Sequence, residues 1–537
     1  MTSRTISSWL SRIGQPESFL TPRLSQLADP TNMLDRPIVV GRIAEAVRQR
    51  QVVVVVGDYD VDGIGASTIL THAVRKMGGI AHQVLASRFD GGYGFSDAVA
   101  DRVLATGARL LVTCDCGSSD HPRIERMNAA GVDVLVIDHH LVPDKPLPAM
   151  GFINPHRPEC PFPYKDMSSV GLAFSVVAGV RQVLGIDFDP RQYLDLVAVG
   201  SVADVMPLTG DNRCLVRAGL SALSRAERPG IRALLGAAKI EPGFEFTGRD
   251  IGFRIAPLIN APGRLGSPDI IAQLLLAETQ QEADALAVQV KDISDRRRLI
   301  TEAITEEAIK EIADHGYGMD PAIVIGREGW NHGIVGIVAG RLTDRFKVPV
   351  IVCGSEGRGS VRGPQGSRLY DVLAASSGTM VKFGGHQAAA GCQVEWSRLG
   401  DLRTAFCRAV ESQPAPPPVD ESALILPLDL EDSQLIEVAN DLMALEPCGQ
   451  GNPRPVLEFL GEIRSAKEVK GGHLKFDMAL DNERVVGGFA IGMGAGADGL
   501  IAQRVRVLGD LRKNTWRGRT KAEIFVKSLE VDNRLAE

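Results

Sequence analysis

The sequence lacks the features of membrane-spanning, secreted and nucleotide-driven proteins. Its apolar runs fall well short of the roughly 18 residues that a transmembrane helix needs. The start, MTSRTISSWLSRIG, has no apolar stretch of the secretory kind, although its arginines and serines also fit an organelle transit peptide. No G-x-x-x-x-G-K-S/T motif is present, and no βαβ unit follows GAGADG (494–499). We therefore expect a cytoplasmic protein with no membrane partner and no use of ATP.

Cysteine is also scarce, with 8 in 537 residues, which excludes a disulfide scaffold. Cys114 and Cys116 flank Asp115, but no second cysteine pair or Cys/His cluster at zinc spacing accompanies them. We expect reduced, buried thiols near a site. A general excess of basic charge is absent too, because the formal net charge is −7. Residues 501–527 are the exception, since they hold eight Lys and Arg against two acids and include Trp516.

The chain is too long for one core, and its 44% hydrophobic and 23% charged residues are those of a globular protein. Alternation of short apolar runs with helical patterns predicts α/β units, and period-two strands after a Pro-rich segment predict a small β-barrel. The expected divisions are a helical lead-in (1–50), a parallel-sheet α/β domain (51–275), a connecting helix ended by Gly316 (276–316), a smaller α/β domain (317–411), a Pro-rich linker (412–420) and the barrel (421–537).

Acidic residues follow several apolar runs of the first α/β domain. VVVVVG leads into Asp58, Asp60 and Asp62, RLLVTC leads into Asp115, VDVLVI leads into Asp138, His139 and His140, and another apolar run leads into Asp204. A lone acid there is usually a cap or turn residue. The carboxyl ends of parallel strands share one sheet edge, however, so we expect these side chains to converge. An EF-hand is excluded, because no Glu occupies the twelfth loop position and the loop follows a strand.

This mixture of carboxylates and imidazoles suits Mn²⁺ or Mg²⁺ better than structural zinc. Four or five carboxylates are too many for one ion that must keep an open position. The sequence therefore predicts two divalent cations, about 3.5–4 Å apart, that activate water and bind a phosphate oxygen. Phosphodiester hydrolysis is the chemistry that follows.

Four motifs, GDYDVDG, TCDCG, DHH and SVADVMPL, resemble those of the DHH phosphoesterase superfamily, and their order resembles the RecJ family of bacterial single-strand-specific 5′-to-3′ DNA exonucleases. The resemblance continues over residues 18–530 in INAPGRLG, GWNHGIVGIVAGRL, FGGHQAAAGC and LEPCGQGNPRP. It implies a DHH catalytic domain, a DHH-associated domain and an OB-fold. One departure is Trp330-Asn331-His332, where such chains usually read W-H before the glycine, so the role of His332 stays open.

The resemblance also implies roles for individual residues. Asp60 and Asp62 would each ligate one metal with Asp58 at the edge, Asp115 would bridge both ions, His139 would be a ligand, and Asp204 would complete the second ion's shell, while His140 would face the phosphate and Asp138 would orient the histidines. The resemblance also implies that Gly384, Gly385 and His386 bind the DNA end. From the residues themselves, Arg264, Arg358 and Arg362 are candidates for phosphate contacts, with solvated loop arginines as the alternative, and Trp516 in the basic stretch is a candidate for base stacking, with a basic barrel surface as the alternative. Spacing alone favours a tight turn into a helix at GGHQAAAG and a solvated face at RRR (296–298).

The resemblance implies a metal-dependent exonuclease that degrades single-stranded DNA in repair and recombination, with a helicase and a single-strand-binding protein as partners. One alternative is a DHH phosphodiesterase for short oligonucleotides or cyclic dinucleotides, but such relatives usually lack the OB-fold module. The other is an inactive scaffold of replication complexes, which would have lost metal ligands that this chain keeps. The discrimination of DNA from RNA stays open.

Overall fold

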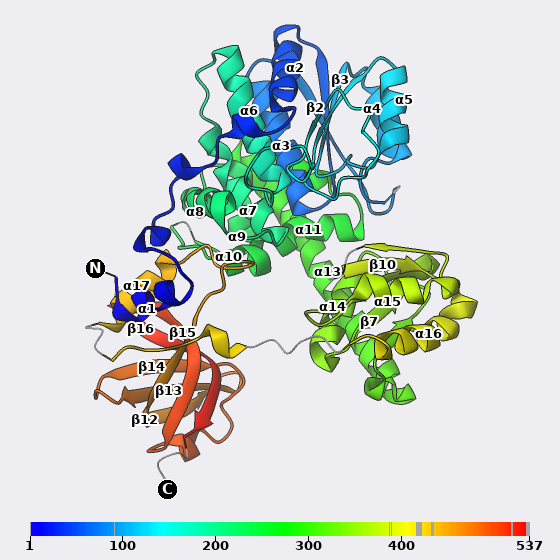
Figure 1. The fold of residues 1–537 in the computed structure, drawn as a ribbon. Helices are drawn as coiled ribbons and strands as arrows, with labels where there is room; N and C mark the ends of the chain where they lie inside the picture. Colours follow the sequence, from blue (N-terminus) through cyan, green and yellow to red (C-terminus); the bar gives the residue numbers. More distant parts are fainter. Residues whose placement is uncertain are drawn as a thin grey trace.

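The protein is built as three units, seen in the computed structural model in Figure 1. The structure describes residues 2–90, 92–241, 243–385, 387, 389–414, 421–430, 434–516 and 519–532, except for the side chains of residues 421, 515, 516 and 519. No helix within these ranges is both long and apolar enough to cross a bilayer. The eight cysteines are free, and six of them are buried, in agreement with the expected reduced thiols.

The first unit contains the predicted parallel sheet, with the strand order β2-β1-β3-β4-β5. Its strands are β1 (Val52–Gly57), β2 (Ile80–Leu85), β3 (Leu110–Cys114), β4 (Asp133–Ile137) and β5 (Gly151–Ile153). Val53 and Val55 enter one hydrophobic core and Val54 and Val56 enter the other, which explains the uninterrupted valine run. The strand order reverses between β1 and β3, so a crevice opens at their carboxyl ends, where ligands bind in such sheets.

Helices cover both faces of this sheet. On one side lie α2 (Arg36–Arg48), α3 (Val61–Lys76) and α6 (Ser169–Leu184), and on the other lie α4 (Asp97–Ala105) and α5 (His121–Ala129). A helical region follows, with α7 (Leu194–Ala203), α8 (Gly210–Arg225), α9 (Pro229–Ala237), α10 (Gly248–Asp250), a π-helical turn (Ile251–Ile255), α11 (Ala256–Leu265) and α12 (Asp269–Leu276). Asp204 therefore follows a helix rather than a strand.

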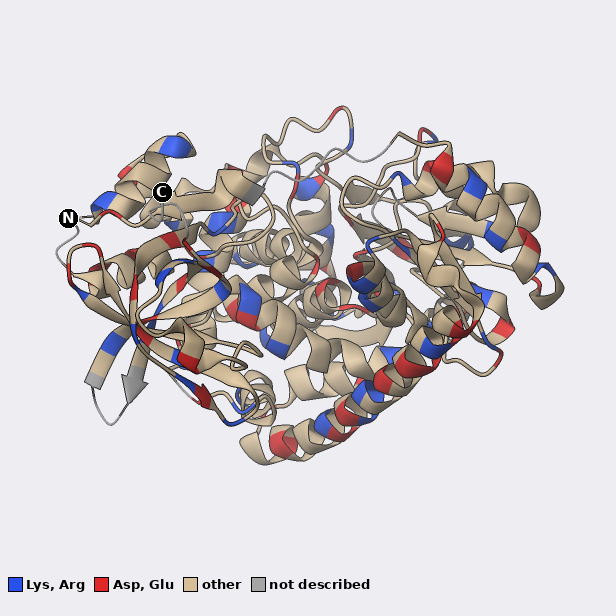
Figure 2. Cartoon of the chain, turned by 90° about the horizontal axis from the view of Figure 1, so that it is seen from below, with Lys and Arg blue, Asp and Glu red and all other residues tan. Residues whose placement is uncertain are grey.

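The long polar helix is confirmed as α13 (Gln280–His315), and Gly316 ends it in the left-handed conformation with φ 73°. Acidic and basic residues are mixed along its exposed length in Figure 2, as expected for a solvated connecting helix. It leads into the second unit, where the sheet order is β6-β7-β8-β10-β9. The elements are β6 (Ile323–Gly326), α14 (Val335–Phe346), β7 (Val350–Cys353), β8 (Arg358–Arg362), α15 (Leu369–Ala375), β9 (Lys382–Gly385), β10 (Ala389–Gln393) and α16 (Leu399–Glu411).

The third unit is the predicted β-barrel. Its elements are β11 (Ile425–Pro427), α17 (Leu435–Ala444), β12 (Val456–Val469), β13 (His473–Leu480), β14 (Val485–Ala490), β15 (Arg504–Trp516) and β16 (Arg519–Val531). The ring β12-β13-β14-β16-β15 closes through pairing of β15 with β12. The N-terminal segment divides between two units, because α1 (Arg4–Arg12) packs in the barrel core whereas α2 packs on the first sheet.

Candidate metal centre and strand-binding surfaces

The acids and histidines of the first unit converge at the carboxyl edge of its sheet. Three sets each offer ligand atoms within 4.8 Å of one another: Asp58, Asp60 and Asp115; Asp62, His139 and Asp204; and Asp115, His139 and His140. His139 Nε2 lies 3.1 Å from Asp115 Oδ1 and 3.4 Å from Asp204 Oδ2. The expected convergence is therefore present. That these residues bind metal stays a prediction.

Local backbone contacts fix the carboxylates of Asp60 and Asp62. Asp60 Oδ1 caps α3 by accepting from the N–H groups of Asp62 (3.0 Å) and Gly63 (3.1 Å). Asp62 accepts from the N–H groups of Ser169 and Val170 at the start of α6, at 2.7 and 2.9 Å. Each carboxylate is thus held by the start of a helix, where negative charge is favourable.

Asp138 contacts the side chain of His140 and the backbone of His139, while the orienting role that the resemblance implies for it stays a prediction. Its Oδ1 accepts from His140 Nδ1 at 2.8 Å and from the His139 N–H at 2.8 Å. Burial alone would raise the pKa of Asp138, but hydrogen bonds from His140 and Ser118 and the His140 charge hold it below its usual range. Burial likewise opposes the charge on His140, yet the Asp138 contact and nearby acids raise the pKa of His140 to about 9. His140 is therefore cationic at neutral pH.

His139 behaves differently, because burial, followed by the charge of His140, lowers its pKa to about 4. It is neutral at pH 7, the form in which an imidazole ligates a metal. Burial and mutual repulsion raise the pKa of Asp58 and of Asp204 to about 8, and that of Asp62 to about 7. The pKa of Asp115 is also raised well above its usual value by burial and by neighbouring aspartates.

Among the residues described, no Lys or Arg side chain lies within 4.0 Å of Asp62, Asp115 or Asp204. The only basic side chains there are His139, which is neutral at pH 7, and His140. So many desolvated carboxylates coexist as anions only if a cation lies among them. An oxygen-rich set with one neutral imidazole fits Mn²⁺ or Mg²⁺. The donor set therefore suits the predicted cofactors.

These pKa shifts predict a pH-dependent stabilisation by metal. In the folded protein the pKa values of Asp58, Asp62 and Asp204 are about 7 to 8, above the unfolded value near 4. Protonation of these aspartates therefore stabilises the metal-free fold fully below pH 4. This stabilisation is lost as the pH rises through 7 to 8. Mn²⁺ should therefore raise the Tm by about 5–10 °C at pH 8 and much less at pH 5.5. Thermal denaturation with and without Mn²⁺ measures both gains. Equal gains at the two pH values would contradict this interpretation.

Sequence reasoning missed two residues beside Asp115. The Tyr93 hydroxyl donates to the Asp115 carbonyl oxygen at 3.0 Å and lies 3.0 Å from His140 Nε2. Ser169 Oγ donates to Asp115 Oδ1 at 3.1 Å. The glycine-rich segment DGGYGFS after β2 was an available signal, since β2 ends at the same sheet edge. Ser169 gave no such signal, because it is brought in by α6.

Arginines gather where the first two units meet. Arg264 donates from Nη1 to the Gly333 carbonyl at 3.2 Å, and burial together with the charges of Arg88, Arg297 and Arg362 lowers its pKa to about 10. Burial and Arg88 also lower the pKa of Arg362. Arg88, which sequence reasoning missed, lies 4.3 Å over the Tyr59 ring and has a buried Nε with no hydrogen-bond partner. Several arginines on one surface, one of them with an unpaired buried N–H, indicate an anion-binding surface.

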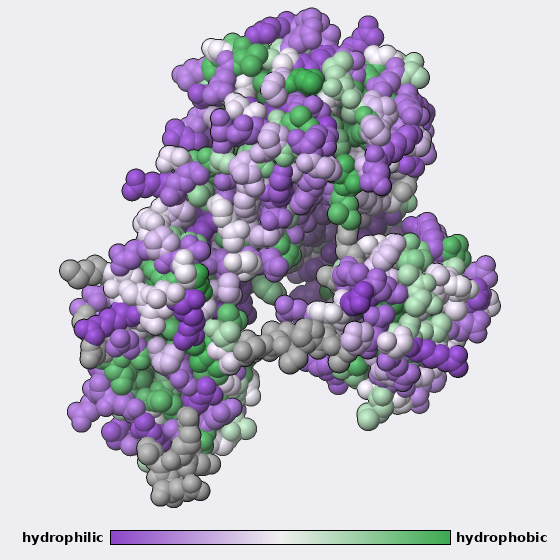
Figure 3. All heavy atoms as spheres, in the orientation of Figure 1, coloured by the Kyte–Doolittle hydropathy of each residue, from purple (hydrophilic) through white to green (hydrophobic). Residues whose placement is uncertain are grey.

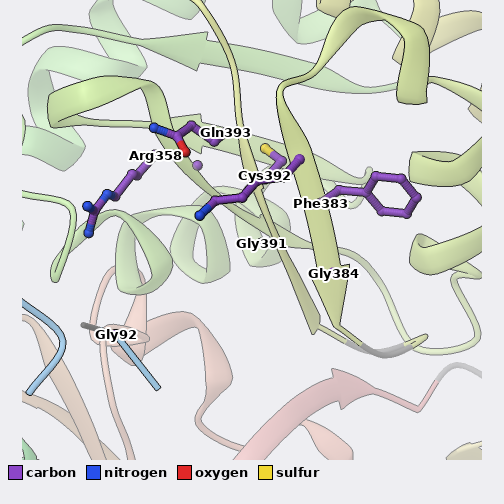
Figure 4. Close-up of a pocket in the computed structure, with 9 residues that line it drawn as sticks. Gly92, Arg358, Phe383, Gly384, Gly391, Cys392 and Gln393 are labelled. Carbon is purple, nitrogen blue, oxygen red and sulfur yellow. The ribbon is translucent and has the colours of Figure 1, made fainter. Parts of the chain in front are cut away.

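The glycine motif of the second unit forms the β9–β10 hairpin, so the alternative of a turn into a helix is wrong. A cavity of about 480 Å³ lies against it, lined by Arg358, Lys382, Gly384 and Gly391 and faced by Gly92 of the first unit (Figure 4). Gly385 has φ 133°, and a Cβ there would lie 2.5 Å from the Ala390 Cα. His386 lies outside the described residues.

Several other residues predicted to bind DNA are paired with acids or lie outside the described part of the chain. Arg358 is paired with Glu356 at 2.8 Å. In the basic C-terminal stretch, Arg504, Arg506, Arg512 and Lys513 are all paired with acids. The Trp516 side chain lies outside the described part of the chain. His332 reaches the first unit, where its ring lies 4.6 Å from that of Phe89.

Comparisons with known proteins agree with this architecture. The model of the DHH family, N-terminal domain, matches residues 52–201, that of the DHHA1 domain matches residues 320–412, and that of the RecJ OB domain matches residues 426–528. The three matches fall on the three units in order.

Curated relatives match along most of the chain. The single-stranded-DNA-specific exonuclease RecJ of Haemophilus influenzae is 32% identical over 94% of this chain and 92% of its own. The Bacillus subtilis RecJ is 29% identical over 96% of this chain, which spans 65% of that relative's length. RecJ from Thermus thermophilus was solved in complex with Mn²⁺, and its structure matches with a TM-score of 0.82 and 28% identity, covering 99% of this chain and 76% of that one. With the aspartates and histidines gathered at one sheet edge and three matching domains in the same order, this chain belongs to the RecJ family.

Proposed function

We propose that this protein is a divalent-metal-dependent exonuclease that removes nucleotides from single-stranded DNA in the 5′-to-3′ direction. The observation that carries the proposal is the convergence of five aspartates and His139 on one sheet edge, since Asp58, Asp60, Asp62, Asp115 and Asp204 all contribute to the three close sets. RecJ relatives are named as single-stranded-DNA-specific exonucleases, and one was solved with Mn²⁺ and with Mg²⁺.

In this proposal Asp60, Asp62, Asp115, His139 and Asp204 hold two cations, with Asp58 at the edge of the site. When bound, such cations activate water and stabilise the negative charge that develops on the phosphate. His140, cationic because of Asp138, provides a charged donor toward the phosphate. The Tyr93 hydroxyl restrains that imidazole from the opposite loop.

Binding of the strand end is assigned to the arginine cluster of Arg88, Arg264 and Arg362 and to the cavity at the β9–β10 hairpin. Both lie between the catalytic edge and the second unit, so a terminal phosphate held there would place one end of the strand at the metal centre. This supports an exonuclease over an endonuclease. The closed barrel supports a long strand over a dinucleotide as substrate, since OB-folds track such backbones.

A nuclease assay tests the proposal. Purified protein with Mn²⁺ should degrade a labelled single strand progressively from its 5′ end and leave a blunt duplex intact. Faster turnover of dinucleotides than of long strands would favour the phosphodiesterase alternative, and no turnover would favour the scaffold. The cytoplasmic location, the helicase and the single-strand-binding protein stay predictions from the resemblance.

Arg88 provides a prediction about strand capture. Arg88→Gln should raise KM for single-stranded DNA about 10- to 100-fold with a small change in kcat, because a charge-assisted hydrogen bond to phosphate is lost. Steady-state kinetics on a 5′-phosphorylated strand measures both constants. Arg191→Gln, at an exposed arginine of the same unit paired with Asp189, is the matched control. An unchanged KM would remove Arg88 from the binding surface.

A further inference from the structure

The segment between α17 and the barrel, residues 445–452, makes a reciprocal contact with the first unit. We call it the lead-in loop. Arg213 and Arg217, one turn apart on α8, donate from Nη1 to carbonyls at the end of α17 and just after it, namely those of Met443, Leu445, Glu446 and Pro447. Cations are favourable at a helix C-terminus, so α8 fixes α17 in place.

Glu446 makes the return contact. It is 2% exposed, and its Oε2 accepts from the Gly248 N–H at 3.1 Å and from the Cys448 N–H at 2.8 Å, while Oε1 pairs with Arg454 at 2.8 Å. Gly248 begins the helical arm 248–265, formed by α10, the π-helical turn and α11. Glu446 of the lead-in loop therefore holds the first residue of an arm that belongs to the first unit.

The same arm lines a cavity of about 680 Å³ whose lining includes residues that neighbour Asp204 in the chain. Val205 and Met206, directly after Asp204, form one wall, Arg249 and Phe253 of the arm form another, and the lead-in loop closes a third. Arg264 and Arg297 also line it. The surface is hollowed where the three units face one another (Figure 3).

The cavity has the composition of a single-strand site. Phe253 is 76% exposed, with the Arg249 guanidinium 5.6 Å from its ring centre, and Val205 is 67% exposed. Single-strand sites combine cationic side chains for the backbone with aromatic faces for the bases. Phe253 lines the same cavity as Val205, the residue after Asp204, so a base held in this cavity could stack on its exposed ring.

We propose that Phe253 is a stacking platform for the strand at the metal centre and that Glu446 is the positioning residue that holds it there. By accepting from Gly248, Glu446 fixes the arm, and the arm fixes Phe253 at the cavity wall. The barrel thus acts on strand capture through the arm as well as through its own surface. This inference rests on the proposed function, since it assumes that the strand occupies the cavity.

A double-mutant cycle tests the inference. Phe253→Ala and Glu446→Ala should each raise KM for single-stranded DNA about tenfold, with kcat within about twofold of wild type. The double variant should resemble either single variant, because both remove the same stacking contact. Glu446→Gln keeps an acceptor for the Gly248 N–H and should recover most of the affinity. An unchanged KM in Phe253→Ala, or additive effects in the double variant, would overturn the inference.

Gly248→Ala separates the arm from the barrel by a second route. A Cβ at Gly248 would lie 2.6 Å from the Cys448 carbonyl oxygen, so this variant should reproduce the rise in KM. Gly236→Ala is the control, because a Cβ there meets nothing within 4 Å. If Glu446 and the arm had only a structural role, these variants would lower kcat by reducing the fraction of folded, active enzyme and would leave KM unchanged. That result would also overturn the inference. Fluorescence anisotropy with a labelled oligonucleotide measures the Kd of each variant without any cleavage. If the wild type binds the strand but does not cleave it, only the proposed function is contradicted, and the inference about Phe253 can still be tested.

Discussion

Asp115→Asn should lower kcat on single-stranded DNA by at least about 10³-fold while changing the Kd for the strand less than threefold. Asp115 is the one aspartate shared by two of the three close sets, and its Oδ1 lies within 3.1 Å of both His139 Nε2 and Ser169 Oγ. Replacing one oxygen by an amide nitrogen removes a ligand and a negative charge without changing the size of the side chain. The loss should therefore fall on chemistry rather than on strand binding.

Asparagine is the right substitution because Asp115 has φ 63°, a left-handed conformation that Asn tolerates better than Ala does. The metal-free variant should be at least as stable as wild type at pH 8, since it removes a buried carboxylate whose pKa is raised by its neighbours. Asp144→Asn, at an exposed position of the same unit, is the matched control. More than about one per cent residual turnover in Asp115→Asn with normal Mn²⁺ affinity would rule out the bridging role.

The sheet edge was predictable because strand pattern and chemistry coincide there. Runs such as VVVVVG are buried on both faces of a parallel sheet, and the residues after them emerge at one edge. The barrel and α13 were predictable for a similar reason, since their periodicities are long and end at recognisable residues such as Gly316. The local sequence was sufficient to predict a structural feature wherever that feature depended on a single helix or strand.

Residues brought in by distant elements were not predictable. The run before Asp204 is buried along most of its length, and such a run has no face that distinguishes a helix from a strand. Ser169 reaches Asp115 only because α6 packs against α3, and Arg88 joins Arg362 only because the first two units meet there. The pairing of Arg506 with Glu458 likewise depends on the register of β12 with β15. The count of basic residues in the C-terminal stretch therefore predicted more unpaired positive charge than the structure has, because several of these residues form ion pairs with acids.

Gly63→Ala should lower kcat at least about 100-fold and lower the free energy of unfolding by about 1–3 kcal/mol. Gly63 lies in the first turn of α3, where the loop that bears Asp58 and Asp60 passes directly over it. A Cβ at Gly63 would lie 2.6 Å from the Asp58 nitrogen and 2.8 Å from its carbonyl oxygen. Backbone atoms cannot rotate away as a side chain can, so the loop must move from the helix. Both carboxylates then shift relative to His139.

Gly41→Ala separates this steric effect from the general effect of alanine in a helix. Gly41 lies inside α2, and a Cβ there meets nothing within 4 Å, so the change should raise stability by up to about 1 kcal/mol and leave kcat unchanged. Urea denaturation and steady-state kinetics on both variants measure the contrast. Because the two substitutions are chemically identical, a loss of activity confined to Gly63→Ala assigns it to the contact with Asp58. Normal cleavage by Gly63→Ala would show that the centre tolerates a displaced loop and that the close approach of α3 is not required for metal binding.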